Sequence, residues 1–377
     1  DRLQTGCRPV ADRLQTRWGP GQARFRPAGA LVQTACKPIP DRAQTCQGQG
    51  GTWRGEAWAA ASRGYHARAM TGVGRAGRVG RRSETMSEQP KGKLTPKTVR
   101  KMVQSGLRRY PKAVARAVMN RPASSLGRLS ISAGDLNRFT GAGLAAMWLG
   151  HGSVLLRIGG RTLLIDPVFS DRIGLQVGNR TIGLERHGPA PPLHEELPQI
   201  DAVLITHAHF DHLDRPTLRM LADKKTRVIV PRGVARLVPP GFAGVDELLA
   251  GEPAEIDGVR LDTVAPRHWG ARVGFDRHRG ALSYIATGRD ARVVLAGDTA
   301  LTRIFEGLGP VDLAALGIGA YEPWEHAHAT PEQAWAMFCG MPGVRMLPVH
   351  HSTFPMSEEP VDEPMQRLLR AAGEGKQ

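Results

Sequence analysis

The stretch HAHFDH, residues 207–212, decides the fold that we expect of this chain. It directly follows AVLIT (202–206), a short β-branched run that is typical of a buried strand. Downstream, Asp214 and Pro216 offer a capping oxygen and a first-turn proline for a helix. The motif therefore lies on a loop between a strand and a helix, and three imidazoles with a carboxylate at this spacing predict a metal site. The alternative is a solvated polar loop whose histidines cap the next helix.

Strand and helix signals alternate around this motif. Short strands broken by glycines are expected at 147–149, 154–158 and 162–165, before a long Pro/Gly-rich connection at 171–198 that is typical of a binding loop. Further on, the pattern predicts helices at 216–223, 234–238, 331–338 and 364–372. It also predicts strands at 227–230, 259–264, 282–287, 293–295, 313–318 and 344–349. Hairpins followed by crossovers indicate layered α/β sheets.

Three more of these strands end in a side chain that can bind metal. His268 follows residues 263–266, Asp298 follows 293–296, and His350 follows 346–349. Loops at one end of a sheet share a rim, and neutral imidazoles and carboxylates are ligands of Zn²⁺. A single histidine of this kind is more often a core or surface residue than a ligand. Their recurrence at strand ends favours binding, and five histidines with two aspartates suit two ions better than one.

Longer motifs give the chain a family resemblance. They are WLGHGSVLLRIGGRTLLIDPVFSDR (148–172), LPQIDAVLITHAHFDHLD (197–214), APRHWGARVGFDR (265–277), AGDTA (296–300), GPVDLAALGIGAYEP (309–323) and PVHHSTF (348–354). From about 125 to 370 the chain resembles the metallo-β-lactamase-fold hydrolases. Within them it is similar to the branch of N-acylphosphatidylethanolamine-hydrolysing phospholipase D and the L-ascorbate-6-phosphate lactonases, and the phospholipase side matches better. The resemblance implies a four-layer αββα sandwich.

The resemblance also implies a ligand set. It places one zinc on His207, His209 and His268, and a second zinc on Asp211, His212 and His350, with Asp298 bridging the two. Other divalent transition metals would fit the same donors. A hydroxide held between the ions would be the nucleophile, with the metals ~3.5–4 Å apart. The resemblance thus implies a cofactor of two Zn²⁺ ions.

Three residues are expected to be catalytic. Asp211 and Asp298 would orient the water and accept its proton, and His328 would contact phosphate or protonate the leaving group. The adjacent His326 is the alternative to His328, and either could be a surface residue. His151 and Asp166 match family positions behind the metal rim, and His351 is expected there or at the surface.

The function expected is that of a binuclear zinc-dependent phosphodiesterase of the phospholipase D-like type. A lactonase or a carboxylic esterase on the same metals is the alternative, because an activated water attacks an acyl carbon equally well. A redox mono-iron site is a minor option. WEHAHATPEQ (324–333) and His351-Ser352 depart from the phospholipase pattern around the cleft, so they bear on the substrate more than on the hydrolysis.

The positive net charge lies in the first third of the chain. The formal net charge is +16, yet residues 1–90 hold 15 basic against 6 acidic residues and residues 91–130 hold 11 against none, whereas the remainder is slightly acidic. We expect residues 1–90 to be a disordered or spurious extension, 91–124 a basic helical lead-in, and 125–377 the hydrolase domain. A nucleic-acid-binding role through the basic N-terminus is the alternative from another class, and nucleic acid is not the expected partner.

The remaining expectations concern location and partners. Three of the four cysteines, Cys7, Cys36 and Cys46, precede the patterned region, which excludes a disulfide framework there and fits a reducing compartment. The sequence shows no apolar run of the ~18 residues that a membrane span needs. We expect a cytoplasmic protein, with membrane association as an option through the basic segment near 95–120. The expected partner is a small-molecule or phospholipid substrate.

Overall fold

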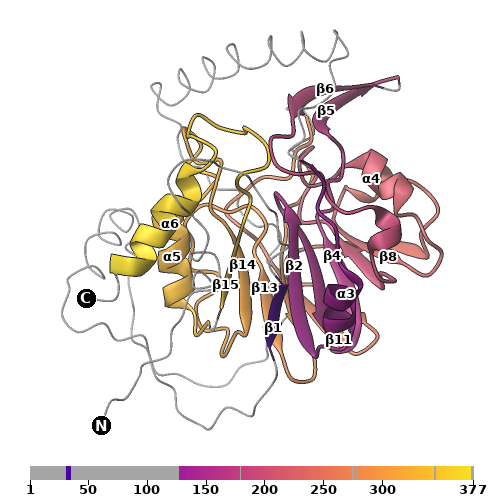
Figure 1. Ribbon diagram of the computed structural model, residues 1–377, viewed down its shortest axis with the longest axis horizontal. Helices are drawn as coiled ribbons and strands as arrows, with labels where there is room; N and C mark the ends of the chain where they lie inside the picture. The colour runs from indigo at the N-terminus through magenta and orange to yellow at the C-terminus, as the bar shows by residue number, and fades with distance from the viewer. Residues whose placement is uncertain are drawn as a thin grey trace, which may run out of the picture.

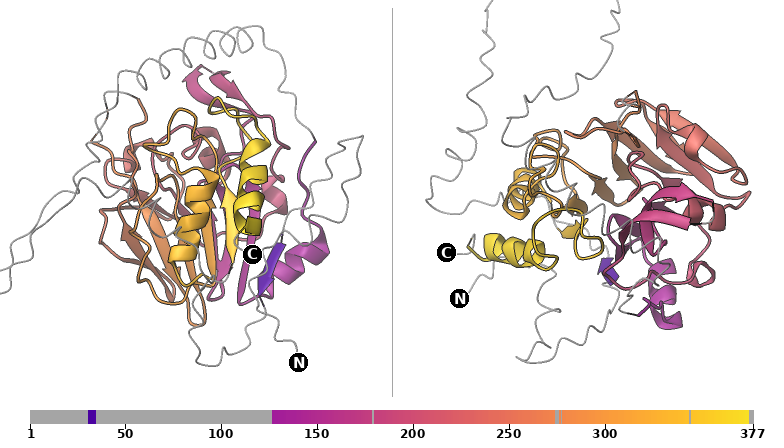
Figure 2. Two further views of the ribbon diagram at one scale, coloured as in Figure 1. Left: turned by 90° about the vertical axis from the view of Figure 1, so that its left-hand side faces the viewer. Right: turned by 90° about the horizontal axis from the view of Figure 1, so that it is seen from above.

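Two β-sheets pack face to face and helices cover their outer faces. The computed structural model describes residues 31–34, 127–178, 180–273, 276, 278–343 and 345–374. In Figure 1 the helices α5 (Pro331–Gly340) and α6 (Glu363–Glu374) lie on one side of the sheets, and α3 (Ala133–Thr140) and α4 (Arg215–Met220) lie on the other. The left view of Figure 2 shows α5 and α6 in front of the strands. The expected four-layer αββα sandwich is confirmed.

The first sheet contains the strand that leads into HAHFDH. Among the described residues its order is β1-β2-β3-β4-β7-β8-β9. These strands are β1 (Leu31–Thr34), β2 (Leu144–Gly150), β3 (Ser153–Ile158), β4 (Arg161–Ile165), β7 (Ala202–Leu204), β8 (Arg227–Pro231) and β9 (Gly244–Leu248). Strands β2 and β4 are both antiparallel to β3, and β7 is parallel to β4. The carboxyl ends of β2, β4 and β7 therefore meet at one edge.

The second sheet repeats this arrangement. Its order, in the same described ranges, is β10-β11-β12-β13-β14-β15. The strands are β10 (Ala254–Ile256), β11 (Val259–Val264), β12 (Ser283–Thr287), β13 (Arg292–Leu295), β14 (Leu313–Gly317) and β15 (Met346–Val349). Strands β11 and β13 are both antiparallel to β12, and β13, β14 and β15 run parallel. The loops that follow β11, β13, β14 and β15 therefore share one edge.

The main core lies between the two sheets. Leu156 and Leu204 of the first sheet pack in one buried cluster with Leu261, Tyr284 and Leu295 of the second. Each fully buried aliphatic side chain of this kind stabilises the fold by about 1.5–3 kcal/mol. A second buried cluster lies beneath α3 and α4, and further clusters lie beneath α5 and α6. The apolar packing thus fixes how the two sheet edges face each other.

Local signals explain the helix starts, with one correction. Thr330 and Gln333 form a capping box at α5, whose first residue is Pro331. Pro216 lies in the first turn of α4 as expected, but the Asp214 side chain does not cap that helix. Its carboxylate instead accepts hydrogen bonds from the Thr217 hydroxyl and from the Ser170 backbone N–H. The helix expected at 234–238 is a short 3-10 turn, Ala235–Leu237.

The connection at 171–198 is a β-hairpin in its first half. Strands β5 (Arg172–Val177) and β6 (Arg180–Glu185) form a sheet of their own that projects at the top of Figure 1. Gly174 faces Gly183 across the hairpin so closely that a Cβ at either position would collide with the opposite backbone. Sequence patterning missed this hairpin because its strands carry glycines and no clean alternation.

The N-terminal expectations are largely outside the described residues. Within the segment 1–90, Leu31–Thr34 is described: it forms β1 and pairs antiparallel with β2. The pairing satisfies backbone groups along an edge of β2 that would otherwise be free. The rest of that segment and the lead-in 91–124 are not described. None of the helices in the described ranges combines the length and apolar character needed to cross a membrane.

Candidate metal centre

The structure brings all the expected ligands together at the shared edge of the two sheets. HAHFDH follows β7, His268 follows β11, Asp298 follows β13 and His350 follows β15. Two groups of side chains have ligand atoms within 4.8 Å of one another. The first, which we call cluster A, is His207, His209, His268 and Asp298, and the second, cluster B, is His151, Asp211, His212 and His350.

Asp298 connects the two clusters. Its Oδ2 lies 3.7 Å from both His207 Nε2 and His268 Nε2 in cluster A. The same carboxylate lies 3.2 Å from His212 Nε2 and, through Oδ1, 3.3 Å from His350 Nε2 in cluster B. The Asp298 side chain is buried, so these imidazoles, and not solvent, surround it. This is the position that the sequence resemblance gave to a bridging ligand.

In cluster A, hydrogen bonds on the far side of the rings aim the imidazole lone pairs inward. The Thr206 hydroxyl donates to Asp166 at 2.6 Å and therefore accepts from His207 Nδ1–H at 3.0 Å. His268 Nδ1–H donates to the Ala327 carbonyl at 3.0 Å. In both residues Nε2 is then the lone-pair nitrogen, and both Nε2 atoms face His209 Nδ1, at 2.8 and 3.2 Å. Converging lone pairs are the donor arrangement that a metal ion needs.

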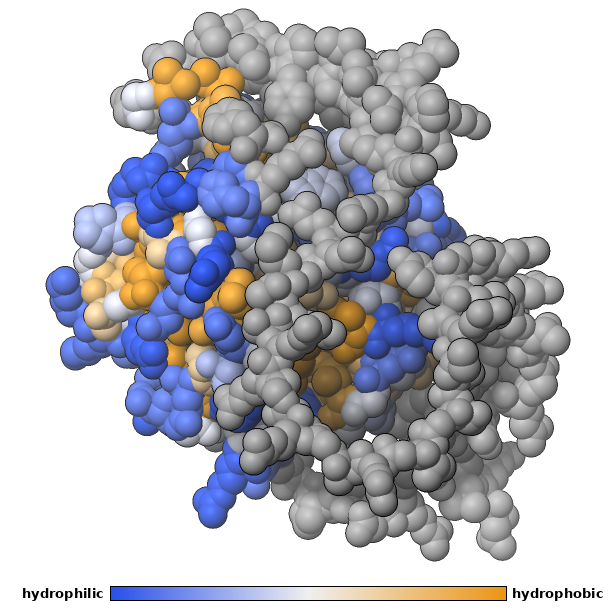
Figure 3. Space-filling model, turned by 180° about the vertical axis from the view of Figure 1, so that it is seen from behind, coloured by the Kyte–Doolittle hydropathy of each residue, from blue (hydrophilic) through white to orange (hydrophobic). Residues whose placement is uncertain are grey.

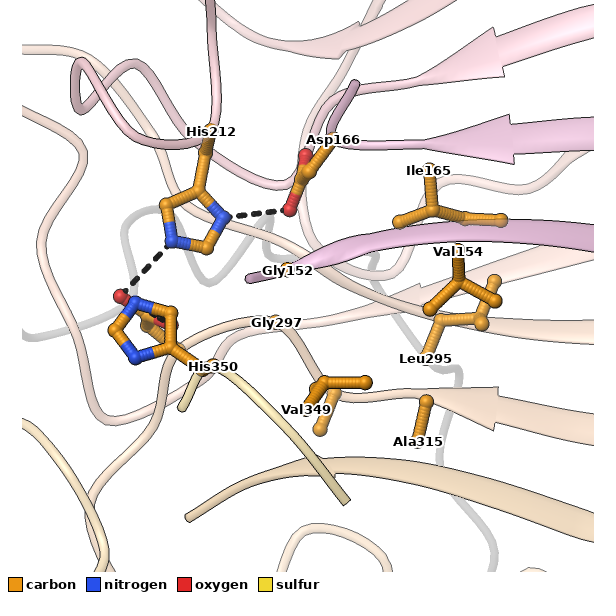
Figure 4. A pocket seen from close by; sticks show the side chains of 12 residues that line it. Gly152, Val154, Ile165, Asp166, His212, Leu295, Gly297, Ala315, Val349 and His350 are labelled. Carbon is orange, nitrogen blue, oxygen red and sulfur yellow. Dashed lines mark hydrogen bonds and ion pairs between the residues drawn. The ribbon is translucent and has the colours of Figure 1, made fainter. Parts of the chain in front are cut away.

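In cluster B, His212 gives the clearest test of fit. Its Nδ1 donates to Asp166 at 2.7 Å, as Figure 4 shows. Its buried Nε2 has no hydrogen-bond partner in the described part of the chain, although Asp211 Oδ2 and Asp298 Oδ2 lie at 3.3 and 3.2 Å. A lone pair facing two carboxylates is unfavourable unless a cation lies among them. The residues present therefore fit a bound cation.

The protonation of the site agrees with this arrangement. Burial, reinforced by neighbouring imidazoles, holds the pKa of His207 and of His268 well below the ordinary histidine value. Burial would raise the pKa of Asp298, yet His212, His350 and other imidazoles outweigh it and hold that pKa well below its usual range. The pKa of Asp211 is lowered in the same way. Neutral imidazoles and ionised carboxylates are the ligand forms that divalent metals bind.

His212 shows the opposite shift. Burial opposes its protonation, but the carboxylates of Asp298, Asp211 and Asp166 outweigh burial and raise its pKa well above the ordinary value. The three carboxylates create a negative potential at the His212 ring, and a metal ion in cluster B would balance it in place of a proton.

His151 and Asp166 have closer contacts than sequence reasoning assigned them. His151 Nε2 contacts Asp211 Oδ2 at 2.8 Å, so its ring belongs to cluster B. Asp166 accepts hydrogen bonds from His212 of cluster B and from the Thr206 hydroxyl, which in turn accepts from His207 of cluster A. Asp166 thereby orients one residue of each cluster. The backbone φ is positive at His151, Asp166 and His350, a conformation that costs non-glycine residues about 1–3 kcal/mol each. Strained backbone at three of these positions is typical of a functional site.

The open side of the site is lined by aromatic residues. Four side chains are half-buried there: His209, Phe210, Trp269 and His328. The expected metal ligands other than His209 are buried. The Trp269 ring stacks on His268, with centroids 4.7 Å apart, and meets His209 edge-on at 5.5 Å. Sequence reasoning noted Trp269 only as part of a motif. Its contacts with two ligands of cluster A depend on the tertiary structure.

The two candidate histidines of the 324–328 segment are separated by the structure. His328 Nδ1 lies 3.8 Å from Asp298 Oδ2, and His328 forms a further candidate group with Asp298 and His350. His326 stacks instead on the outer face of Trp269, with centroids 6.0 Å apart. His351 stacks on Trp148 at 4.6 Å, away from the ligands. The geometry thus favours His328 over His326 as the residue that meets a substrate.

A small cavity lies behind the ligands, between the two sheets. Its polar wall includes Asp166, His212, Asp298 and His350, and its apolar wall includes Val154, Ile165, Leu295 and Val349 (Figure 4). Its volume of about 10 Å³ is enough for about one water molecule, so it cannot hold a substrate. The half-buried aromatic residues on the opposite side are the part of the site that solvent reaches.

Comparisons with known proteins give the family of the chain. The family model described as Beta-lactamase superfamily domain matches residues 161–351. An uncharacterized protein of Mycobacterium tuberculosis is 34% identical over 273 residues, which cover 69% of this chain and 71% of that protein. N-acyl-phosphatidylethanolamine-hydrolyzing phospholipase D 1 of Caenorhabditis elegans is 31% identical over 267 residues, or 65% of this chain and 74% of that protein.

The structure of a metallo hydrolase from Ignicoccus hospitalis superposes with a TM-score of 0.46 at 21% identity, over 61% of this chain and 91% of that one. The family match spans every expected ligand from His207 to His350, and the mycobacterial relative extends over more than two thirds of the chain. The chain therefore belongs to the beta-lactamase superfamily and is a metal-dependent hydrolase.

Proposed function

We propose that this hydrolase is a binuclear, zinc-dependent phosphodiesterase of the N-acylphosphatidylethanolamine phospholipase D type. The observation that carries the proposal is the shared carboxylate of Asp298, which faces two imidazoles of cluster A and two of cluster B. One carboxylate between two sets of converging nitrogens is the arrangement that two neighbouring divalent ions require. The donors, imidazole nitrogens and carboxylate oxygens, suit zinc.

Two bound ions would supply Lewis acidity and would acidify water in a phosphodiester hydrolysis. The residues of the chain have separate tasks in that reaction. Asp211 is held by His151 and His350, whose Nε2 atoms lie 2.8 and 3.2 Å from its Oδ2. Asp298 makes longer contacts of 3.2–3.8 Å, so it is the freer carboxylate and the better placed to orient water and accept a proton.

His328 would contact the phosphate. Burial lowers the pKa of His328 to about 4, so its ring is neutral at pH 7 and has no extra proton to give to a leaving group. A neutral imidazole still has one N–H to donate to a substrate oxygen. Of the two roles considered for this residue, hydrogen bonding to a non-bridging oxygen therefore has more support than protonation of the leaving group.

A substrate with an apolar part fits the surroundings of the site. Phe210 and Trp269 are half-buried at its open side. The base of the β5–β6 hairpin packs near Phe210, through Ile173 and Leu184, while Leu175 and Val177 toward its tip are 56% and 59% exposed. Figure 3 shows apolar surface at the upper left, where this hairpin lies. These features support a phospholipid substrate taken up with peripheral contact to a membrane.

A substrate panel tests the proposal on the full chain. Bis(p-nitrophenyl) phosphate and vesicles containing N-acylphosphatidylethanolamine are compared with p-nitrophenyl acetate and a simple lactone, and metal content is measured on the same sample. We expect cleavage of both phosphodiesters and about two zinc ions per chain. Turnover of the ester or lactone without phosphodiester cleavage would favour a lactonase or esterase instead. Iron near one per chain would contradict the zinc assignment.

A further inference from the structure

Two turns that are far apart in the sequence are tied together beside cluster B. The turn after β2 carries His151, and the turn after β15 carries His350. The His350 backbone N–H donates to the His151 carbonyl at 2.9 Å. The His151 backbone N–H donates to Thr353 Oγ1 at 2.7 Å, and that hydroxyl donates to the His351 carbonyl at 3.0 Å. The single hydroxyl of Thr353 thus accepts from one turn and donates to the other.

Both turns have unfavourable backbone conformations. The φ angles are 50° at His151, 61° at His350 and 53° at Ser352, where a side chain with a Cβ is disfavoured. Such residues persist only where surrounding contacts hold them. Thr353 is 2% exposed, so water cannot replace its hydroxyl. Loss of this hydroxyl would leave the buried N–H of His151 without its acceptor, in a turn that is already strained.

Loss of the Thr353 hydroxyl would change the contacts of Asp211 in cluster B. His151 and His350 reach this carboxylate from the two turns, with Nε2 atoms 2.8 and 3.2 Å from Oδ2. Cluster A is held in other ways, since Thr206 orients His207 and the Ala327 carbonyl orients His268. We propose that Thr353 is a positioning residue that acts through His151 and His350 to set the affinity of cluster B for its metal, while cluster A is unaffected. This inference rests on the proposed binuclear site.

The experiment compares two substitutions in the full chain. Thr353→Val keeps the shape of the side chain and removes the hydroxyl, and Thr353→Ser keeps the hydroxyl. Zinc affinities are measured by competition with a chromogenic chelator, and thermal unfolding of the metal-free protein is recorded for each variant. We expect Thr353→Val to weaken one of two zinc affinities by about 10–100-fold and to leave the other unchanged. Thr353→Ser should match the parent protein at both sites.

A second background identifies the affected cluster. His268→Ala disables cluster A, and Thr353→Val added to it should still weaken the zinc that remains. Unchanged zinc affinities in Thr353→Val, or an equal loss at both sites with a less stable metal-free protein, would overturn the inference. If Thr353→Val does not fold, Thr353→Ala decides, because it removes the same hydroxyl that accepts from the His151 backbone N–H at 2.7 Å. A selective loss in this variant supports the inference, and no loss refutes it.

The inference and the proposed function can fail separately. A parent protein that binds a single zinc ion, or that does not cleave phosphodiesters, would refute the proposed function. The His268→Ala background would still show whether the Thr353 hydroxyl controls the affinity of cluster B.

Discussion

Replacing Asp298 by asparagine should weaken metal binding and turnover together. The substitution keeps the size of the side chain and one carbonyl oxygen, but it removes the negative charge that faces His207, His268, His212 and His350. Because the carboxylate is buried and its pKa is held well below the usual range, that charge is fully present at neutral pH. The change therefore tests the charge and not the packing.

The size of the effect follows from the distances in the site. The ligand atoms of cluster A, which include an oxygen of Asp298, lie within 4.8 Å of one another, so an ion bound among them lies no farther than this from Asp298. At an effective dielectric constant of about 20, one unit charge at this distance contributes about 3 kcal/mol, or roughly a 100-fold change in affinity. A divalent ion would lose more. Loss of the proton acceptor should lower kcat by a further factor of about 10²–10⁴.

The assay combines zinc competition with hydrolysis of bis(p-nitrophenyl) phosphate at saturating zinc. Asp262→Asn is the matched control, because Asp262 lies on β11 at the surface, where it pairs with Arg260, and it undergoes the same chemical change. Circular dichroism of the metal-free proteins checks that both variants are folded. If Asp298→Asn retained the zinc affinity and the kcat of the parent protein, Asp298 would not be shared between the clusters and the two-ion reasoning would be wrong.

Four further outcomes are expected. His328→Ala should lower kcat by about 10²-fold or more, since it removes a hydrogen-bond donor at the site. His326 stacks on Trp269, so His326→Ala should change hydrolysis little. Equal effects of the two substitutions would contradict the assignment of His328 to the substrate. His207→Ala should abolish turnover and reduce bound metal. Chelation should lower the melting temperature by about 5–10 °C per ion lost when zinc is about 100-fold above its Kd, and added zinc should restore it. Arg272→Met should lower the free energy of unfolding by about 2–4 kcal/mol in urea titrations. The reason is that Arg272 donates to the Ala208 and Leu213 carbonyls at 3.0 and 2.8 Å and covers the Phe210 ring. Arg219→Met, at an exposed position of α4, should change the free energy of unfolding little.

The expected ligands could be identified from the sequence because each signal is local. HAHFDH follows a buried β-branched run, and His268, Asp298 and His350 each follow another such run. Strands of one direction end at the same sheet edge, so residues after β7, β11, β13 and β15 meet once the two sheets pack. Composition and period were sufficient for this prediction and for layered α/β sheets, because both depend on short segments of chain, whereas the four-layer αββα order was implied by the family resemblance.

Other features had no local signal. The β5–β6 hairpin is rich in glycine, and its backbones approach closely at Gly174 and Gly183. The entry of His151 into cluster B depends on how β2 lies against β15. The expectation that Asp214 caps α4 was wrong because the nearby Ser170 N–H and Thr217 hydroxyl compete for its carboxylate. These outcomes depend on neighbours that no window of sequence contains.

Local periodicity and strand-end chemistry lie in consecutive residues, so the layered fold and the residue types at the rim could be predicted without a structure. Which side chains share a charge, and which hold others in place, depends on how the two sheets pack. Asp298 lies between the two clusters, and the hydroxyl of Thr353 meets a backbone N–H 202 residues away. The physical reason is that hydrogen bonds and charge interactions act over a few ångströms, so they depend on strand order and packing and not on separation along the chain.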